Sequence, residues 1–157
     1  EITQFTYFQK AGGMPCSPVS VELTYGIERL AMYMQNVDHY RDLRWNDTIK
    51  FGELRKEEER QFSIYNFEAA NIDMLWELFK LYETEVEALL ARDLHFPAYD
   101  YVLKCSHTFN LLDARGAISI TERPAMIGRI RNLASKVARA HVAHREALGF
   151  PLCNDSQ

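Results

Sequence analysis

The chain has 157 residues, of which 47% are hydrophobic and 25% are charged, and its net charge at pH 7 is -4. This length suits one ordinary domain or part of a larger protein, and the composition is typical of soluble globular proteins. No run of 18 apolar residues occurs, so no membrane-spanning helix is predicted. The negative net charge does not by itself indicate a nucleic-acid-binding protein.

Two strands and a helix are predicted at the start of the chain. Residues 1–9 are rich in β-branched and aromatic side chains, which favours a strand. The glycines and prolines of residues 11–18 predict a loop, and the alternation over residues 19–25 predicts a second strand, antiparallel to the first. From Gly26 the apolar spacing changes to that of a helix, which we expect to reach Gln35.

Most of the remaining chain is predicted to be helical. An apolar stripe over residues 71–92 follows Asn71, a suitable N-cap. Another helix should end at a turn near Gly116, and Thr121 is the expected N-cap of a long helix that stops near residues 149–151. Three aromatic residues of the first of these helices are predicted core residues: Trp76, Phe79 and Tyr82.

Charge is concentrated in the last helix. Residues 121–150 hold six Lys or Arg and two Glu, a net charge of +4, so the rest of the chain carries -8. Such a helix could bind RNA phosphates or a protein partner. A solvated helix face explains the same pattern, and the sequence leaves both interpretations open.

Arg29 lies where a cation is locally unfavourable. The first turn of a helix carries the positive end of the macrodipole, so an arginine there suggests an anionic ligand. Its guanidinium suits phosphate, and Gly26 leaves the backbone of the corner open to a flat ligand. The alternative is an ordinary surface pair of Glu28 and Arg29.

Histidine and cysteine residues give weaker indications. His141 and His144 have a spacing that can bind metal, but no third ligand lies near them in the sequence. Cys105 and His107 could suggest a nucleophile, although a buried structural thiol is the simpler interpretation. The cysteines, Cys16, Cys105 and Cys153, are odd in number and far apart, which favours a reducing compartment, and we therefore expect the cytoplasm.

Four segments carry a resemblance to a known family. "ELTYGIERLAMYMQ" resembles motif 3 of class II aminoacyl-tRNA synthetases, and "EITQFTYFQ" resembles the strand before it. "YNFEAANID" and "HTFNLLDARGAISITER" resemble the helical part of the alpha subunit of the bacterial heterotetrameric glycyl-tRNA synthetase. The resemblance covers essentially the whole chain.

The resemblance implies an α+β, mostly helical fold. Residues 1–38 would be the end of a class II antiparallel-sheet catalytic domain, and residues 39–157 an α-helical domain. Motifs 1 and 2 have no counterpart here, so we expect the later part of a longer chain, which alone would be inactive.

The resemblance also implies roles for individual residues. Arg29 would be catalytic and hold the γ-phosphate of ATP, Gly26 would lie under the adenine, and Glu1 and Gln4 would face the Mg²⁺–ATP triphosphate. Glu22 would pair with the α-ammonium group of glycine, because a carboxylate on a polar strand face can do so.

Thr6 and Thr24 would complete the glycine pocket, in which bulk excludes larger amino acids. The implied activity is a glycine–tRNA ligase that uses ATP and Mg²⁺ to form glycyl-adenylate and charge tRNA-Gly. The implied partners are a beta subunit and a second alpha subunit, with no membrane. The alternative is an inactive fragment or a helical interaction module that docks on the beta subunit.

Overall fold

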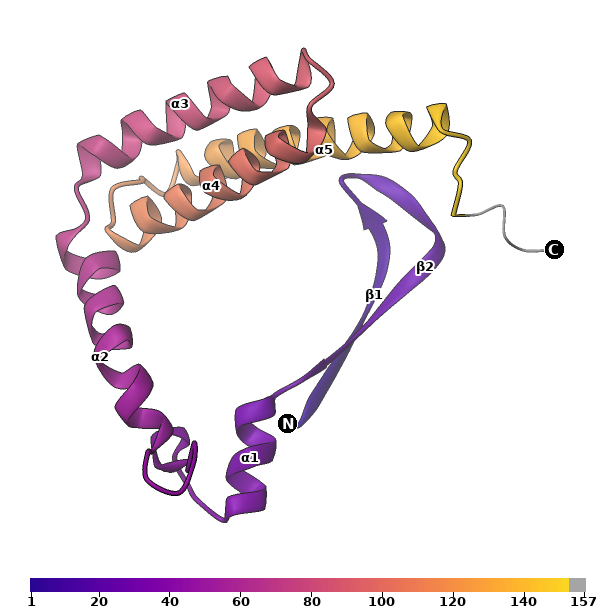
Figure 1. Cartoon of the computed structure of the whole chain (residues 1–157). Coiled ribbons are helices and arrows are strands. Elements are labelled where there is room, and N and C mark those ends of the chain that lie inside the picture. The colour runs from indigo at the N-terminus through magenta and orange to yellow at the C-terminus, as the bar shows by residue number, and fades with distance from the viewer. Residues whose placement is uncertain (153–157) are drawn as a thin grey trace. The chain divides into compact units, whose positions relative to one another are not determined.

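The computed structural model of the chain describes residues 1–152, so Cys153 lies outside the described part. Two strands come first and helices follow (Figure 1). In chain order the elements are β1 (Thr3–Ala11), β2 (Met14–Tyr25), α1 (Ile27–Gln35), the 3-10 helix η1 (Tyr40–Asp42), α2 (Phe51–Ile64), the π-helix η2 (Tyr65–Ala69), α3 (Ile72–Leu90), α4 (His95–Ala114) and α5 (Arg123–Ala147). The predicted α+β, mostly helical fold class is confirmed.

β1 and β2 form a two-stranded hairpin with a tight turn, where the sequence predicted a loop over residues 11–18. Gly12 and Gly13 make this turn with φ angles of +57° and +83°, which glycine adopts without steric cost. Pro15 and Pro18 lie inside β2. The sheet tolerates them because a strand in a two-stranded sheet forms hydrogen bonds to its partner along one edge only, and no N–H is needed on the other edge. The loop prediction was wrong because two glycines suffice for the turn.

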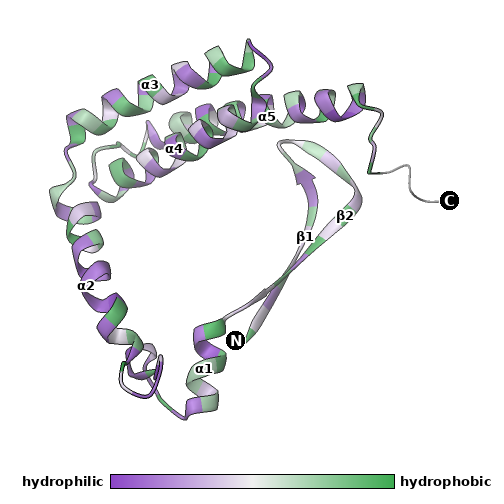
Figure 2. Cartoon of the chain, in the orientation of Figure 1, coloured by the Kyte–Doolittle hydropathy of each residue, from purple (hydrophilic) through white to green (hydrophobic). Residues whose placement is uncertain are grey.

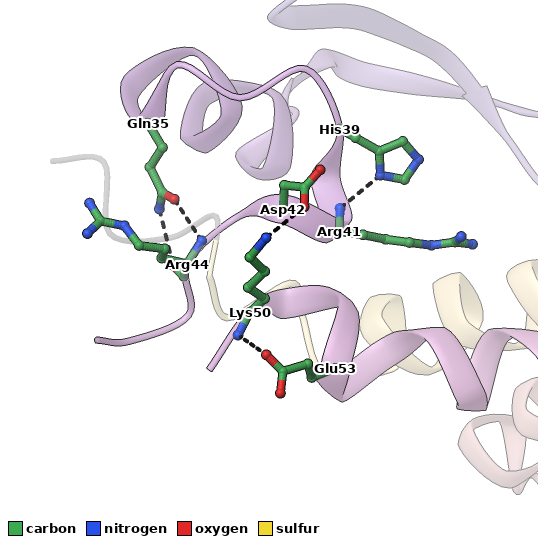
Figure 3. Close-up of polar contacts among 7 residues, drawn as sticks. All are labelled: Gln35, His39, Arg41, Asp42, Arg44, Lys50 and Glu53. Carbon is green, nitrogen blue, oxygen red and sulfur yellow. Dashed lines mark hydrogen bonds and ion pairs between the residues drawn. The ribbon is translucent and has the colours of Figure 1, made fainter. Parts of the chain in front are cut away.

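Polar contacts hold the segment between α1 and α2 (Figure 3). The Gln35 side chain brackets the backbone of Arg44, donating to its carbonyl at 3.1 Å and accepting from its N–H at 2.7 Å. Lys50 Nζ pairs with Asp42 at 3.0 Å, and the Lys50 N–H donates to Glu53 at 2.9 Å at the start of α2. These contacts tie the end of α1 to the start of α2.

The main hydrophobic core belongs to α3, α4 and α5, which lie side by side (Figure 1). Phe79 is fully buried, and Trp76 and Tyr82 pack against the core, as predicted. The predicted N-cap is also confirmed, because the Asn71 side chain accepts the Met74 N–H at 3.0 Å.

The hairpin and α1 contrast with this core. Hydrophobic residues occur along both strands (Figure 2), yet every residue of β1 is exposed, and so is almost every residue of β2. Phe5, Tyr7 and Leu23 each expose about 60% of their surface (63%, 60% and 62%). Both faces of the hairpin are therefore accessible within this chain.

The ends of α5 test two predictions. The helix begins at Arg123 with Glu122 as its N-cap, so the predicted Thr121 cap was wrong by one residue, since Pro124 suits the first helical positions. The predicted stop is confirmed, because α5 ends at Ala147 and Gly149 follows with a φ of +71°.

The chain divides into two compact units, residues 1–10 with 15–69, and residues 11–14 with 70–157. The predicted boundary between residues 38 and 39 separates the end of a catalytic domain from a helical domain. The division into compact units does not test it, so it stays a prediction. Within residues 1–152, no helix combines the length and apolar character needed to traverse a bilayer.

Candidate functional site

A recess of about 210 Å³ lies at the open end of the hairpin, where β1 begins and β2 leads into α1. We call it the junction recess. Its lining residues are Glu1, Ile2, Thr3, Gln4, Thr24, Tyr25, Gly26 and Arg29. All four residues predicted to bind ATP therefore lie around one recess, together with Thr24, whereas Thr6 and Glu22 do not line it.

Two hydrogen bonds bring the first residues to the start of α1. The Gly26 N–H donates to the carbonyl of Ile2 at 3.0 Å, and Arg29 Nη1 donates to the carbonyl of Glu1 at 3.0 Å. β1 begins only at Thr3, so Glu1 lies outside the regular pleat. The rule that successive strand residues point to opposite faces therefore does not apply to Glu1, which can line the recess together with residues of β1.

The start of α1 can accept an anion. Gly26 is its N-cap and provides no side-chain cap, so the first N–H groups of the helix lack an intrahelical partner. Arg29 adds a guanidinium, only one of whose donors is used by Glu1. Glu28 in the same turn offsets part of this positive potential. A phosphate group suits these donors, because its oxygens accept several hydrogen bonds at once.

No contact among the described residues 1–152 requires glycine at position 26. Its φ is -78°, and a Cβ built there would contact the Arg29 side chain at no less than 3.5 Å. The missing side chain therefore matters only to something that approaches the backbone from outside the chain.

The register of the hairpin near the recess follows from the bond between Gly26 and Ile2. The strand ends Thr3 and Tyr25 form the next pair, because antiparallel strands pair residue by residue. β2 has 12 residues and β1 has 9. The residue-by-residue pairing is therefore interrupted between this end of the hairpin and its turn.

The register at this end of the hairpin bears on the predicted glycine-binding residues. Continued without a bulge from the Gly26 pair, it would place Gln4 opposite Thr24 and Thr6 opposite Glu22. Directly opposed side chains project from the same face of a sheet. In that register the four polar side chains would share one exposed face of the hairpin.

Three lining residues were not predicted from the sequence. Ile2 and Thr3 join the recess because they lie beside the end of β2, a contact that only the register reveals. For Tyr25 the sequence offered one indication of a place in the recess, namely that it directly precedes Gly26.

The Cys105 thiol is structural. It is fully buried, and burial raises its pKa to about 11 because a low-dielectric environment disfavours the thiolate. A nucleophilic role with His107 is therefore unsupported, and the predicted buried thiol is confirmed. Among residues 1–152, no group of three or more His, Cys, Asp or Glu is arranged to hold a metal ion.

Ion pairs engage half of the basic residues of α5. Arg129 pairs with Glu83, and Lys136 pairs with Glu87 at 2.6 Å, which ties α5 to α3. Arg123 pairs with Asp113 of α4 at 3.1 Å. Three cations make no ion pair with any described residue: Arg131, Arg139 and Arg145. These remain available to a partner.

Comparison with protein families first gives the class of the chain: residues 1–146 match a family of aminoacyl-tRNA synthetase subunits, which are ligases of protein biosynthesis. The family is described as glycyl-tRNA synthetase alpha subunit, and the chain belongs to it. The resemblance predicted from the sequence is confirmed. Membership supports a role in glycine–tRNA ligation and implies glycine and tRNA as substrates and a beta subunit as partner.

Proposed function

We propose that the chain contributes motif 3 of a class II active site, which forms glycyl-adenylate from glycine and ATP and then charges tRNA-Gly. The glycine carboxylate attacks the α-phosphorus of ATP, a carboxyl–phosphate bond forms, and the bond to pyrophosphate breaks. A terminal ribose hydroxyl of the tRNA then attacks the glycyl carbonyl, an ester bond forms, and the carboxyl–phosphate bond breaks so that AMP leaves. The chain's residues act by positioning and charge stabilisation rather than by covalent catalysis.

The observation that carries this proposal is the junction recess. Glu1 and Gln4 come from the start of the chain, and Gly26 and Arg29 come from the start of α1, yet all four line the same recess. Its donors suit a triphosphate: Arg29 would neutralise the γ-phosphate, and the open backbone at Gly26 would lie under the adenine.

The donor set also fits Mg²⁺ carried by ATP. Mg²⁺ prefers oxygen ligands and in nucleotide sites is held by one or two carboxylates together with substrate phosphates. The Glu1 carboxylate and the Gln4 amide oxygen would supply the protein's share, since both line the recess. When bound, Mg²⁺ would offset the negative charge of the phosphates.

Glycine would bind on the polar face of the hairpin beside the recess. Glu22 would pair with its ammonium group, and Thr6 and Thr24 would limit the space for a side chain. A regular register continued from the Gly26 pair supports this, because it would put both side chains on the face that carries Gln4 and Thr24.

Glycine-dependent ATP–pyrophosphate exchange by the full-length alpha subunit with its beta subunit tests the proposal. Arg29→Ala should lower kcat/KM for ATP by a factor that corresponds to about 2–4 kcal/mol, because it removes a charge-assisted contact to phosphate. Arg55→Ala is the matched control, since Arg55 is an exposed arginine that pairs with Glu58 on α2. Normal exchange by folded Arg29→Ala protein would refute the assignment.

A second function is supported by the compact unit that holds α3, α4 and α5. This unit has its own core, so it could serve as an interaction module that docks on the beta subunit or on a second alpha subunit. Co-purification of residues 70–157 with the beta subunit would favour this role.

We also propose a cytoplasmic location, because the thiols of Cys16 and Cys105 are free, as is usual in a reducing compartment.

A further inference from the structure

Three histidines from two helices meet where α4 begins. His95 is the first residue of α4, and His141 and His144 lie near the end of α5. The ring centroid of His95 is 5.2 Å from that of His141 and 5.0 Å from that of His144. The Phe96 ring also lies close, with its centroid 4.4 Å from that of His95. We call the three histidines the imidazole cluster.

His95 is the enclosed member of the cluster. Only 6% of its surface is exposed, and its Nε2 is buried without a hydrogen-bond partner. A neutral imidazole can keep one ring nitrogen as an unprotonated acceptor, whereas a protonated ring carries a donor on both nitrogens. Protonation of His95 would therefore bury an N–H donor with no acceptor, which is costly.

The charges around His95 also favour its neutral form. Burial lowers the pKa of His95, charge on His141 and His144 of α5 lowers it further, and Asp93 in the turn before α4 acts in the opposite direction through its backbone and its charge. The helix ends add to this contrast, because the N-terminus of α4 disfavours a cation and the C-terminus of α5 favours one. His95 is therefore the member of the cluster that resists protonation.

A cavity of about 400 Å³ adjoins the cluster and offers no acid to His95. Within the unit formed by residues 11–14 and 70–157, its walls include His95 and His141 together with Phe96, Tyr99 and Val137. Tyr99 contributes a phenol and no carboxylate. The other lining residues have no titratable side chain: Ala11, Gly12, Ala134 and Ala138.

We propose that the imidazole cluster is a proton-sensitive clasp that holds the start of α4 against the end of α5. At neutral pH the rings pack together and the contact is closed. Below about pH 6.5, the ordinary value for histidine, positive charge accumulates in the cluster and the contact opens toward the cavity. The pKa of His95 is lower in the folded state than in the unfolded state, so the stabilisation is complete above pH 6.5 and decreases as the pH falls below it.

Urea unfolding of the full chain at pH 7.5 and pH 5.5 tests the clasp. The matched variants are His95→Leu and His107→Leu, because His107 lies on the same helix but is exposed. Between pH 7.5 and pH 5.5 the folding equilibrium constant should fall by up to about tenfold more in the wild-type protein and in His107→Leu than in His95→Leu. This difference is the effect of one additional proton bound by the unfolded state over one pH unit. Equal losses in all three proteins would overturn the proposal.

Histidine-ring NMR of the wild-type protein keeps the proposal testable if His95→Leu does not fold. The His95 ring should remain largely neutral at pH 6.5, the ordinary value for histidine, and the double substitution of His141 and His144 by Gln should move its titration toward that value. Half protonation of His95 at pH 6.5 or above in the wild-type protein would overturn the clasp. A different outcome is that added Zn²⁺ stabilises the wild-type protein at pH 7.5 and that each histidine substitution abolishes this stabilisation. The cluster would then be a metal site, and the clasp would be overturned.

Discussion

Gly26 allows a test that separates the needs of the fold from those of a ligand. A methyl group at this position would have the Arg29 side chain as its nearest neighbour, at an ordinary distance of 3.5 Å, and the φ of -78° suits any residue. Gly26→Ala should therefore fold normally. If the adenine of ATP lies over this backbone, the added methyl group should raise the ATP KM by about tenfold or more, roughly 1.4 kcal/mol, as measured by pyrophosphate exchange.

Gly128→Ala is the matched control for this substitution. Gly128 lies inside α5, and a Cβ there would meet nothing within 4 Å. Alanine should stabilise the helix by about 1 kcal/mol and leave the ATP KM unchanged. A wild-type ATP KM in Gly26→Ala would show that the nucleotide binds away from this corner.

Glu22 allows charge and volume to be separated. Glu22→Gln keeps the size of the side chain and removes its charge, so the glycine ammonium group would lose its ionic partner. We expect a rise in the glycine KM of about tenfold or more, roughly 1.4 kcal/mol, with little change in the ATP KM. Glu85→Gln is the control, since Glu85 is an exposed carboxylate on α3. An unchanged glycine KM in Glu22→Gln would place the ammonium group elsewhere.

Glu22→Ala extends the test to the specificity for glycine. This substitution removes the charge and also opens space opposite Thr6, so activation of alanine should rise relative to activation of glycine. The readout is pyrophosphate exchange with each amino acid. Retained rejection of alanine would show that another element forms the wall of the pocket.

At the scale of an element, the basic residues of α5 fall into two groups. Arg129 and Lys136 face α3 and pair with Glu83 and Glu87, so these cations hold the helix in its unit. Arg131 and Arg139 are exposed and make no such pair among the described residues. The net charge of the helix is therefore larger than the charge available to a partner. Arg131 and Arg139 can be substituted without breaking an interhelical ion pair.

Reversal of Arg131 and Arg139 to Glu tests whether that part binds tRNA. Pyrophosphate exchange should be unchanged, because adenylate formation does not involve tRNA. The KM for tRNA should rise, and the slope of its salt dependence should decrease by about one for each phosphate that the helix no longer neutralises. The same charge change at Arg55 and Arg60 of α2 is the control. If aminoacylation and its salt dependence match those of the wild-type enzyme, this face of α5 is only solvated.

At the scale of the whole molecule, the sequence predicted those features that depend on local pattern. The stripe over residues 71–92 repeats with the helical period, so α3 and its buried Phe79 were predicted correctly. The hairpin turn was missed because the glycines and prolines of residues 11–18 are signals for a loop and for a turn alike.

Contacts between distant segments lay beyond the pattern of the sequence. Glu1 and Gln4 were proposed from the family resemblance, and their proximity to Arg29 depends on the register of the hairpin. The contact of His95 with His141 depends on how α4 and α5 pack, so helical spacing alone could not reveal it. Periodicity reports which face of an element is buried, not which element covers it.

The two compact units should differ in their ability to fold alone. Residues 1–69 contain two buried residues, Leu43 and Gly52, so this segment buries almost no apolar surface by itself. Residues 70–152 contain the whole cluster of buried core residues on α3, α4 and α5. Because apolar burial is the main term that offsets conformational entropy, only the second segment should form a stable fold.

Two separate fragments test this difference. Residues 70–152 should give a helical circular dichroism spectrum and one cooperative thermal transition, whereas residues 1–69 should unfold without a sharp transition. Phe79→Ala in the first fragment should lower its free energy of unfolding by about 3–5 kcal/mol, because Phe79 is fully buried. Trp45→Ala, which removes an aromatic residue with 64% of its surface exposed, is the matched change in the second fragment and should have little effect. A cooperative transition in residues 1–69, or none in residues 70–152, would show that the stability of the chain is not concentrated in the three-helix unit.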